Sequence, residues 1–312
     1  MQAAMNCIPR FFTLPLSDKL KARGNPLCRN WGYAGAGAHS DRFTANLPWK
    51  ETLSFGSDSA SSDSMVADYF VSTLGDGFRE MGAVYQKYCE AMMKLALSIM
   101  ELLGMSLGVD RAHFREFFGD GNSIMRLNYY PPCQEPELTF GTGPHCDPTS
   151  ITILLQQDEV DGLEVFSRGE WRVVRPARGA LIVNIGDTFM VTHISLINLC
   201  LFLLLHEIYV LYRANNALTN GMYKSCLHRA VVNKVKERSS LAFFLCPRIN
   251  RVVRPPECLV NEENPRKYPD FTWAELFDFT QKHYRADMET LPTFTHWLLS
   301  SSRSHYSHPS PP

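Results

Sequence analysis

The sequence predicts a mainly β fold with flanking helices, whose core is an antiparallel sandwich or jelly roll. From Ile124 onward, short apolar runs recur about every ten residues, with turn residues between them. Before and after this region, apolar residues repeat every three to four positions, which is the period of an amphipathic helix. The predicted strands cover residues 124–130, 150–156, 162–166, 171–176, 180–189, 225–232 and 240–246.

Helices are expected on both sides of the strands, over residues 1–24, 65–107, 111–118 and 272–284. The apolar stripe in residues 65–107 is typical of a core helix rather than of a cofactor site. In the last helix, Thr272 is a candidate N-cap, and Glu275 lies three residues later as its capping-box partner.

Two polar segments are expected to lie outside the core. Residues 25–64 resemble a loop, and the run 54–64 (SFGSDSASSDS) is too polar to pack, so we expect a mobile surface loop there. Residues 300–312 are expected to form a disordered tail. The expected organisation is an N-terminal helical and loop region, a core and a C-terminal helical cap, at residues 1–119, 120–249 and 250–299.

The composition of the chain limits the classes of function that it can have. The chain has 312 residues, 45% of them hydrophobic, and a formal net charge of -1, so neither a nucleic-acid nor a membrane partner is expected. Nine cysteines occur without a C-x-x-C pair, which favours reduced thiols and a cytoplasmic location. The first residues lack the pattern of a signal peptide. We expect a monomer that acts on a small molecule.

The candidate metal ligands begin with His145 and Asp147, two residues apart ahead of an alternating apolar run. On a strand, residues i and i+2 share a face. His228, in another β-like run, is the candidate third ligand; two histidines and a carboxylate on one face of a metal leave the opposite face open. A lone His-x-Asp pair is more often structural. Cys146 should point to the other face, into the core.

Two further pairs of residues favour the interpretation of this cluster as a metal site. Arg238 and Ser240 share a strand face and suit a carboxylate held by charge-assisted hydrogen bonds. Asn128 and Tyr130 also share a face, although alone they would be interpreted as ordinary core residues. A zinc hydrolase is a weaker alternative, because no general-base carboxylate lies near the ligands and the Arg-x-Ser pair stays unexplained.

Several stretches resemble the plant 2-oxoglutarate- and iron(II)-dependent dioxygenases. They are NYYPPC (128–133), GPHCDPTSITIL (143–154), VNIGD (183–187), TNGMYKSCLHRAV (219–231) and RSSLAFFL (238–245). Others resemble the gibberellin 20-oxidase branch: LPWKETLSF (47–55), the CPR and VVRPP stretches within 246–256, YPDFTWAEL (268–276) and FTQKHYRADM (279–288). The resemblance covers most of residues 9–298, except 191–216.

The resemblance implies a double-stranded β-helix (jelly-roll) core with an Fe(II) site made by His145, Asp147 and His228. It also implies a 2-oxoglutarate site made by Asn128, Tyr130, Arg238 and Ser240. O₂ would be the second co-substrate and ascorbate the reductant. The substrate would be a C20 gibberellin, oxidised in successive steps at C-20 to a C19 gibberellin.

Two departures from this family are expected to matter. Relatives carry some tens of residues before the position of Met1, which would contribute to the sheet edge and the substrate site. Residues 191–216 interrupt a stretch that is continuous in relatives, between Met190 and Ala217. The favoured interpretation is a mis-spliced or retained intron; a tolerated surface loop comes next, and a membrane span is the weakest.

Two alternatives to a gibberellin oxidase stay open. One is another plant 2-oxoglutarate dioxygenase, acting on a different hormone or a flavonoid. The other is a catalytically impaired product, truncated and mis-spliced, in which the insert displaces His228 from the site.

Overall fold

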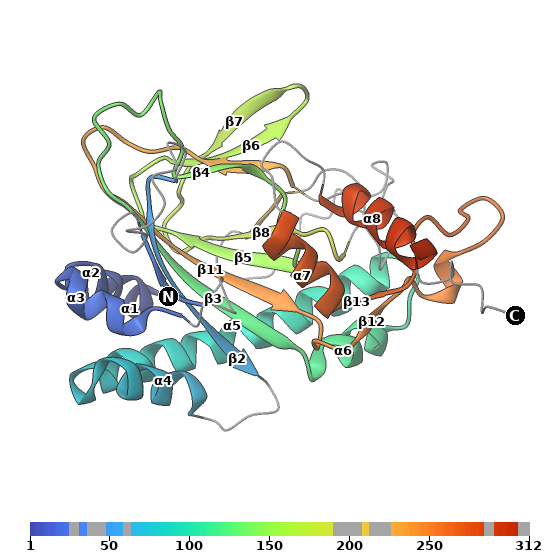
Figure 1. Cartoon of the computed structure of the whole chain (residues 1–312), viewed down its shortest axis with the longest axis horizontal. Helices are drawn as coiled ribbons and strands as arrows, with labels where there is room; N and C mark the ends of the chain where they lie inside the picture. The colour runs from blue at the N-terminus through green and yellow to red at the C-terminus, as the bar shows by residue number, and fades with distance from the viewer. Residues whose placement is uncertain are drawn as a thin grey trace, which may run out of the picture.

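Two β-sheets face one another across the molecule, and helices lie against the outer face of the larger sheet (Figure 1). The computed structural model describes residues 1–24, 31–35, 48–58, 64–189, 208–211, 226–283 and 290–304. Antiparallel sheets packed in this way, with helices at their flanks, confirm the predicted jelly-roll fold class.

Among the described residues, the larger sheet has the strand order β1-β2-β3-β11-β5-β8-β9. Its strands are β1 (Gly32–Ala34), β2 (Glu51–Asp58), β3 (Asn122–Tyr130), β11 (Arg238–Cys246), β5 (Ile151–Gln156), β8 (Leu181–Ile185) and β9 (Ile208–Leu211). Neighbouring strands are antiparallel except for β8 and β9, which are parallel.

The smaller sheet has the order β4-β10-β6-β7 in the described part of the chain, and its pairs are antiparallel. Its strands are β4 (Thr142–His145), β10 (His228–Ala230), β6 (Leu163–Ser167) and β7 (Glu170–Val174). A short ribbon joins β12 (Val252–Val253) to β13 (Phe271–Thr272). Each of the seven predicted strands is found, as β3, β5, β6, β7, β8, β10 and β11.

The central strands β3 and β11 separate the core from the interior of the roll. Their residues alternate between two faces, as the period of two requires. Met125, Leu127, Leu241 and Phe243 are buried in the main hydrophobic core with residues of helix α5 (Arg79–Ser106). The intervening residues, polar at one end of the ladder, line the space between the sheets.

The remaining helices occupy the predicted regions of the chain. They are α1 (Gln2–Asn6), α2 (Ile8–Phe12), α3 (Leu16–Lys19), α4 (Met65–Leu74), α6 (Arg111–Gly119), α7 (Trp273–His283) and α8 (Thr290–Ser304). Short 3₁₀ turns occur at Leu20–Ala22, Asp76–Phe78 and Glu257–Leu259. None of the described helices has the length and apolar character of a membrane span.

The helical stripe over 65–107 is broken once. Gly75 has φ of +93°, a conformation that costs glycine little, and the chain turns there between α4 and α5. The predicted capping box of α7 is present: the Glu275 amide donates to Thr272 Oγ1 (3.3 Å), and the Thr272 amide donates to Glu275 Oε2 (2.6 Å).

The expected loop over 25–64 is wrong in part. β2 includes Ser54–Asp58, because main-chain pairing with β3 needs no apolar side chain and alternate residues Leu53 and Phe55 are fully buried. The rest of the serine-rich run, 59–63, lies outside the described residues. The disordered tail expected over residues 300–312 is wrong for residues 300–304, which belong to α8, and residues 305–312 lie outside the described residues.

The insert 191–216 lies mostly outside the described residues. Its described part is β9, which pairs with β8 in parallel from Leu181↔Ile208 to Asn184↔Leu211. This pairing places β9 at one edge of the larger sheet.

Candidate metal centre

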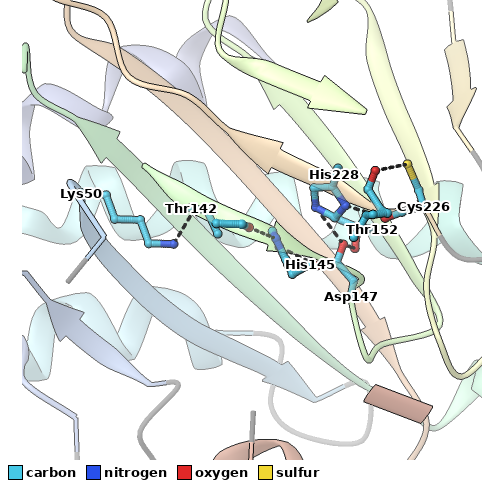
Figure 2. Close-up of polar contacts among 9 residues, drawn as sticks. Lys50, Thr142, His145, Asp147, Thr152, Cys226 and His228 are labelled. Atoms are coloured by element: carbon cyan, nitrogen blue, oxygen red, sulfur yellow. Dashed lines mark hydrogen bonds and ion pairs between the residues drawn. The ribbon is translucent and has the colours of Figure 1, made fainter. Parts of the chain in front are cut away.

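Three side chains predicted as ligands converge between the two sheets (Figure 2). His145 ends β4, and His228 begins β10 directly opposite it in the antiparallel register. One donor atom from each of His145, Asp147 and His228 lies within 4.8 Å of the others. Among the described residues, this is the cluster of His, Cys, Asp and Glu that has the geometry to hold a metal ion.

The path of the chain differs from the expected one. β4 ends at His145, so Asp147 lies in the connection to β5 rather than on the same strand. The Asp187 amide donates to the Asp147 carbonyl (2.7 Å), which ties this connection to the end of β8. Cys146, expected in the core, is half-buried and lines the cavity, because the strand has already ended.

Both imidazole rings are oriented by main-chain carbonyls. His145 Nδ1 lies 2.8 Å from the Gly143 oxygen, and His228 Nδ1 lies 2.8 Å from the Cys226 oxygen. A carbonyl only accepts, so each Nδ1 carries a proton, and in the neutral ring each Nε2 keeps its lone pair. The two Nε2 atoms lie 3.6 and 3.9 Å from the Asp147 carboxylate oxygens, which leaves three donors facing one point.

A hydroxyl group holds the carboxylate in place. Thr152 Oγ1, on β5, donates to Asp147 Oδ2 at 2.6 Å. Burial raises the pKa of Asp147, but the neighbouring charges of His228 and His145, together with the Thr152 hydrogen bond, more than offset this and lower it. Burial and the His228 charge lower the pKa of His145 to about 3. The site therefore presents an anionic carboxylate and a neutral imidazole.

The other predicted site residues lie on facing positions of one ladder. Arg238 pairs with Tyr130 and Ser240 with Asn128 across β11 and β3, so all four point into the roll. Asn128 Nδ2 donates to Ser240 Oγ at 3.2 Å. The Arg238 guanidinium carbon lies 5.1 Å from the centre of the Tyr130 ring.

The buried Arg238 guanidinium has hydrogen-bonding capacity left over. Its side chain donates through Nη2 to Gln156 Oε1 at 2.6 Å, while the residue is only 3% exposed. Its Nε and Nη1 atoms have no hydrogen-bond partner among the described residues. Buried donors without partners are costly, and a carboxylate is the group that matches this fork. These residues therefore suit an anionic ligand beside the metal ligands.

All seven predicted site residues line one cavity of about 930 Å³. Its walls come from both sheets and from α7, which contributes Trp273 and Phe277. Sequence reasoning did not identify Thr152, Gln156, Lys50 or Arg126, which also line the cavity or support it. The two-residue spacing of Arg126 from Asn128 was a signal that could have found Arg126.

Comparisons with known proteins agree with this arrangement. The model of the 2OG-Fe(II) oxygenase superfamily matches residues 121–197 and 206–247. Gibberellin 20 oxidase 2 of Oryza sativa subsp. indica is 57% identical over 297 residues, which are 95% of this chain and 68% of that protein. Gibberellin 20 oxidase 1 of Arabidopsis thaliana is 54% identical over 93% of this chain and 69% of its own length.

Solved structures show the same architecture. The crystal structure of JOX2 in complex with 2OG, Fe and JA has a TM-score of 0.67 and 28% identity, over 89% of this chain and 74% of that one. A 2OG-Fe(II) oxygenase family protein from Caulobacter crescentus has a TM-score of 0.68 and 25% identity, over 91% and 85%. The chain belongs to the gibberellin 20-oxidase family of the 2OG-Fe(II) oxygenases.

Proposed function

We propose that this chain uses 2-oxoglutarate and O₂ to oxidise a C20 gibberellin at C-20, in steps that lead to a C19 gibberellin. One observation carries the proposal: the metal-ligand cluster lies in the walls of one cavity with two Arg238 donors that have no partner among the described residues. The gibberellin substrate follows from the relatives, which are gibberellin 20 oxidases at 50–57% identity.

His145, Asp147 and His228 are the proposed Fe(II) ligands. The two imidazoles offer Nε2 lone pairs because their Nδ1 protons are held by carbonyls, and Thr152 keeps the carboxylate turned toward them. When bound, iron(II) together with 2-oxoglutarate supplies the oxygen-activating chemistry, and the 2-oxo acid leaves as succinate and CO₂. Three protein ligands leave room for these co-substrates.

Arg238 and Ser240 are proposed to bind the distal carboxylate of 2-oxoglutarate. The Nε and Nη1 donors of Arg238 have no hydrogen-bond partner in the described part of the chain, and Gln156 and Tyr130 fix the plane of its guanidinium. Asn128 and Tyr130 line the same end of the cavity. These contacts neutralise the carboxylate and set the orientation of the 2-oxo acid relative to the metal ligands.

The remainder of the cavity suits a rigid apolar acid. Ile124, Phe244, Trp273 and Phe277 give it an apolar wall. A volume of about 930 Å³ lies within the usual range for a site that holds a small molecule together with a co-substrate. Such walls exclude water while the carbon is oxidised.

Ascorbate is the proposed reductant that keeps iron in the ferrous state. A monomer is proposed because every candidate ligand comes from one chain, so no second copy is needed to complete the site. A cytoplasmic location is proposed because the described cysteines, Cys7, Cys89, Cys133, Cys146, Cys226, Cys246 and Cys258, are all free thiols.

The test is a substrate panel analysed by mass spectrometry. The chain is incubated with Fe(II), 2-oxoglutarate and ascorbate, and with a C20 gibberellin, a jasmonate, an auxin or a flavanone in separate reactions. The proposal predicts oxidised gibberellin products, ending in loss of C-20, and no comparable product from the other compounds. Turnover of another compound with the gibberellin left unchanged would contradict it.

A further inference from the structure

A buried side-chain amide in the wall of the cavity has an unused hydrogen-bond acceptor. Asn184, on β8, is only 2% exposed and lines the cavity. Its Oδ1 atom has no hydrogen-bond partner among the residues that the structure describes. A buried acceptor without a donor is costly, so a group that enters the cavity and donates a hydrogen bond to Asn184 is stabilised there.

The strand register fixes the direction of this side chain. Val183 and Ile185, on either side of Asn184, belong to the main hydrophobic core, so Asn184 faces the interior of the roll. Its cross-strand partner on β5 is Thr152, the residue that donates to the Asp147 carboxylate (Figure 2). Cross-strand partners on one face have Cβ atoms about 5 Å apart. Asn184 therefore lies beside the residue that holds a metal ligand.

A second unused polar group lies on the neighbouring segment. Thr149, two residues after Asp147, is 5% exposed and lines the cavity, and its Oγ1 atom has no hydrogen-bond partner in the described part of the chain. The Thr149 carbonyl accepts from the Thr188 amide at 3.2 Å, and a Cβ atom at Gly186 would collide with it. The segment that carries Thr149 is thus packed against the end of β8, close to Asn184.

These two groups lie apart from the proposed 2-oxoglutarate site. Thr152 pairs with Phe244 of β11 on one side and with Asn184 of β8 on the other, so the three residues form one row across the sheet. Phe244 is six residues from Arg238 along β11, which is about 20 Å on an extended strand. The row of Asn184 is therefore at the end of the cavity that has the apolar wall, and the distal carboxylate held by Arg238 cannot reach it.

The chemistry of the two groups selects a class of ligand. An amide oxygen accepts hydrogen bonds and never donates them, so its partner must carry a donor. A carbonyl, an ether or a carboxylate offers acceptors only and leaves Asn184 Oδ1 unsatisfied. A hydroxyl group can donate to Asn184 Oδ1 and accept from the Thr149 hydroxyl at the same time.

We propose that Asn184 and Thr149 form a subsite for the hydroxyl group of a partly oxidised substrate, the alcohol that the first oxidation step leaves on the reacting carbon. This inference rests on the proposed function, in which one carbon is oxidised in successive steps. In the first step one atom of O₂ converts a C–H bond into C–OH, and 2-oxoglutarate takes the other atom and leaves as succinate and CO₂. The subsite holds the alcohol in the cavity for the next step instead of releasing it.

The test compares the binding of two C20 gibberellins, one with a methyl group at C-20 and one with the matching C-20 alcohol. The chain is loaded with Fe(II) and 2-oxoglutarate without O₂, so that neither compound is oxidised, and calorimetry gives the two Kd values. Asn184→Leu removes the amide at similar size, and Thr149→Val removes the hydroxyl while Thr149→Ser keeps it. Ile182→Val is the control for a disturbance of β8, because Ile182 belongs to an apolar cluster with Leu154 and Ala242.

We expect the wild-type chain to bind the alcohol about tenfold more tightly than the methyl compound, as two neutral hydrogen bonds imply. This ratio should fall toward one in Asn184→Leu and Thr149→Val, and it should stay at the wild-type value in Thr149→Ser and Ile182→Val. When O₂ is admitted to chains loaded with the methyl compound, mass spectrometry should find several-fold more released alcohol for Asn184→Leu and Thr149→Val than for the wild-type chain.

A wild-type chain with equal affinity for the two compounds would overturn the inference, because the subsite would then hold only water. Variants that weaken both compounds by the same factor would also overturn it, since that is the pattern of a structural defect. If Asn184→Leu does not fold, the comparison of Thr149→Val with Thr149→Ser decides. A wild-type chain that neither binds nor oxidises the methyl compound would refute the proposed function as well, whereas one that oxidises it but binds the alcohol no better would refute this inference alone.

Discussion

At the scale of single residues, the metal centre depends on a hydroxyl group that touches no metal. Thr152→Val keeps the shape of a β-branched residue but removes the donor to Asp147 Oδ2. The carboxylate is then free to rotate, and we expect the Kd for Fe(II) to rise about 10- to 100-fold. Anaerobic Fe(II) titration measures it.

The matched control is Thr295→Val, which removes a hydroxyl bonded to the Leu291 carbonyl within α8. It should leave the Fe(II) affinity at the wild-type value. An unchanged Fe(II) affinity in Thr152→Val would mean that the threonine bond does not orient the ligand.

Burial and the nearby Arg126 charge lower the pKa of Lys50 to about 7, which has a consequence for stability with a defined sign. The unfolded chain holds the Lys50 proton up to about pH 10.4, whereas the folded protein releases it at about 7. Between these values the unfolded state binds more protons, so this group makes the protein more stable as pH rises.

The residues that sequence reasoning identified share one property: they belong to short patterns with fixed spacing. His145 and Asp147, and Arg238 and Ser240, are two positions apart, and the structure brings both pairs into one cavity. Thr152 and Gln156 act through contacts across 5 and 82 positions, which no local pattern reveals. Their roles follow from strand register rather than from spacing.

At the scale of secondary-structure elements, a buried ion pair joins the N-terminal helices to the main sheet. Lys19 Nζ donates to Glu51 Oε2 (2.6 Å) and to the Phe12 carbonyl (3.2 Å), and Tyr33 Oη donates to the same carboxylate oxygen (2.6 Å). The side chains of Lys19 and Glu51 are only 10% and 22% exposed. The pair therefore fixes the start of β2, the residue after Lys50.

Glu51→Gln should leave Lys19 buried without its anion, and the free energy of unfolding should fall by about 3 kcal/mol. Asp278→Asn, which breaks an exposed pair with Lys282, should cost less than about 1 kcal/mol. Urea denaturation of both variants gives the comparison. Equal losses in the two would show that the Lys19 pair is no more than a surface contact.

The elements show where sequence patterns succeed and where they fail. Strands with continuous apolar runs, such as β5 and β11, were predicted, because burial on both faces leaves a strong signal. β2 was missed, since its polar half is a strand only through pairing with β3. The sequence analysis also placed His145 and Asp147 on one strand, whereas β4 ends at His145. The His-x-Asp spacing is the same on a strand and in a turn, so the spacing could not reveal where the strand ends.

At the scale of the whole molecule, the insert does not separate the ligands. One alternative left open by the sequence was that residues 191–216 displace His228, yet His228 lies opposite His145 in register and its ring centre is 4.2 Å from that of His145. β10, which carries His228, is paired with β4 on one side and with β6 on the other. Loop closure entropy grows slowly with length, so an insertion between strands is compatible with the fold.

The most direct test of the central claim is the ratio of succinate formed to gibberellin oxidised, measured for the intact chain and for Asp147→Ala with Fe(II), 2-oxoglutarate and ascorbate. The account predicts one succinate per oxidation step in the intact chain, and neither product above background in Asp147→Ala, which lacks the carboxylate ligand. Substrate oxidation that persists in Asp147→Ala, or an intact chain that oxidises gibberellin without forming succinate, would contradict it.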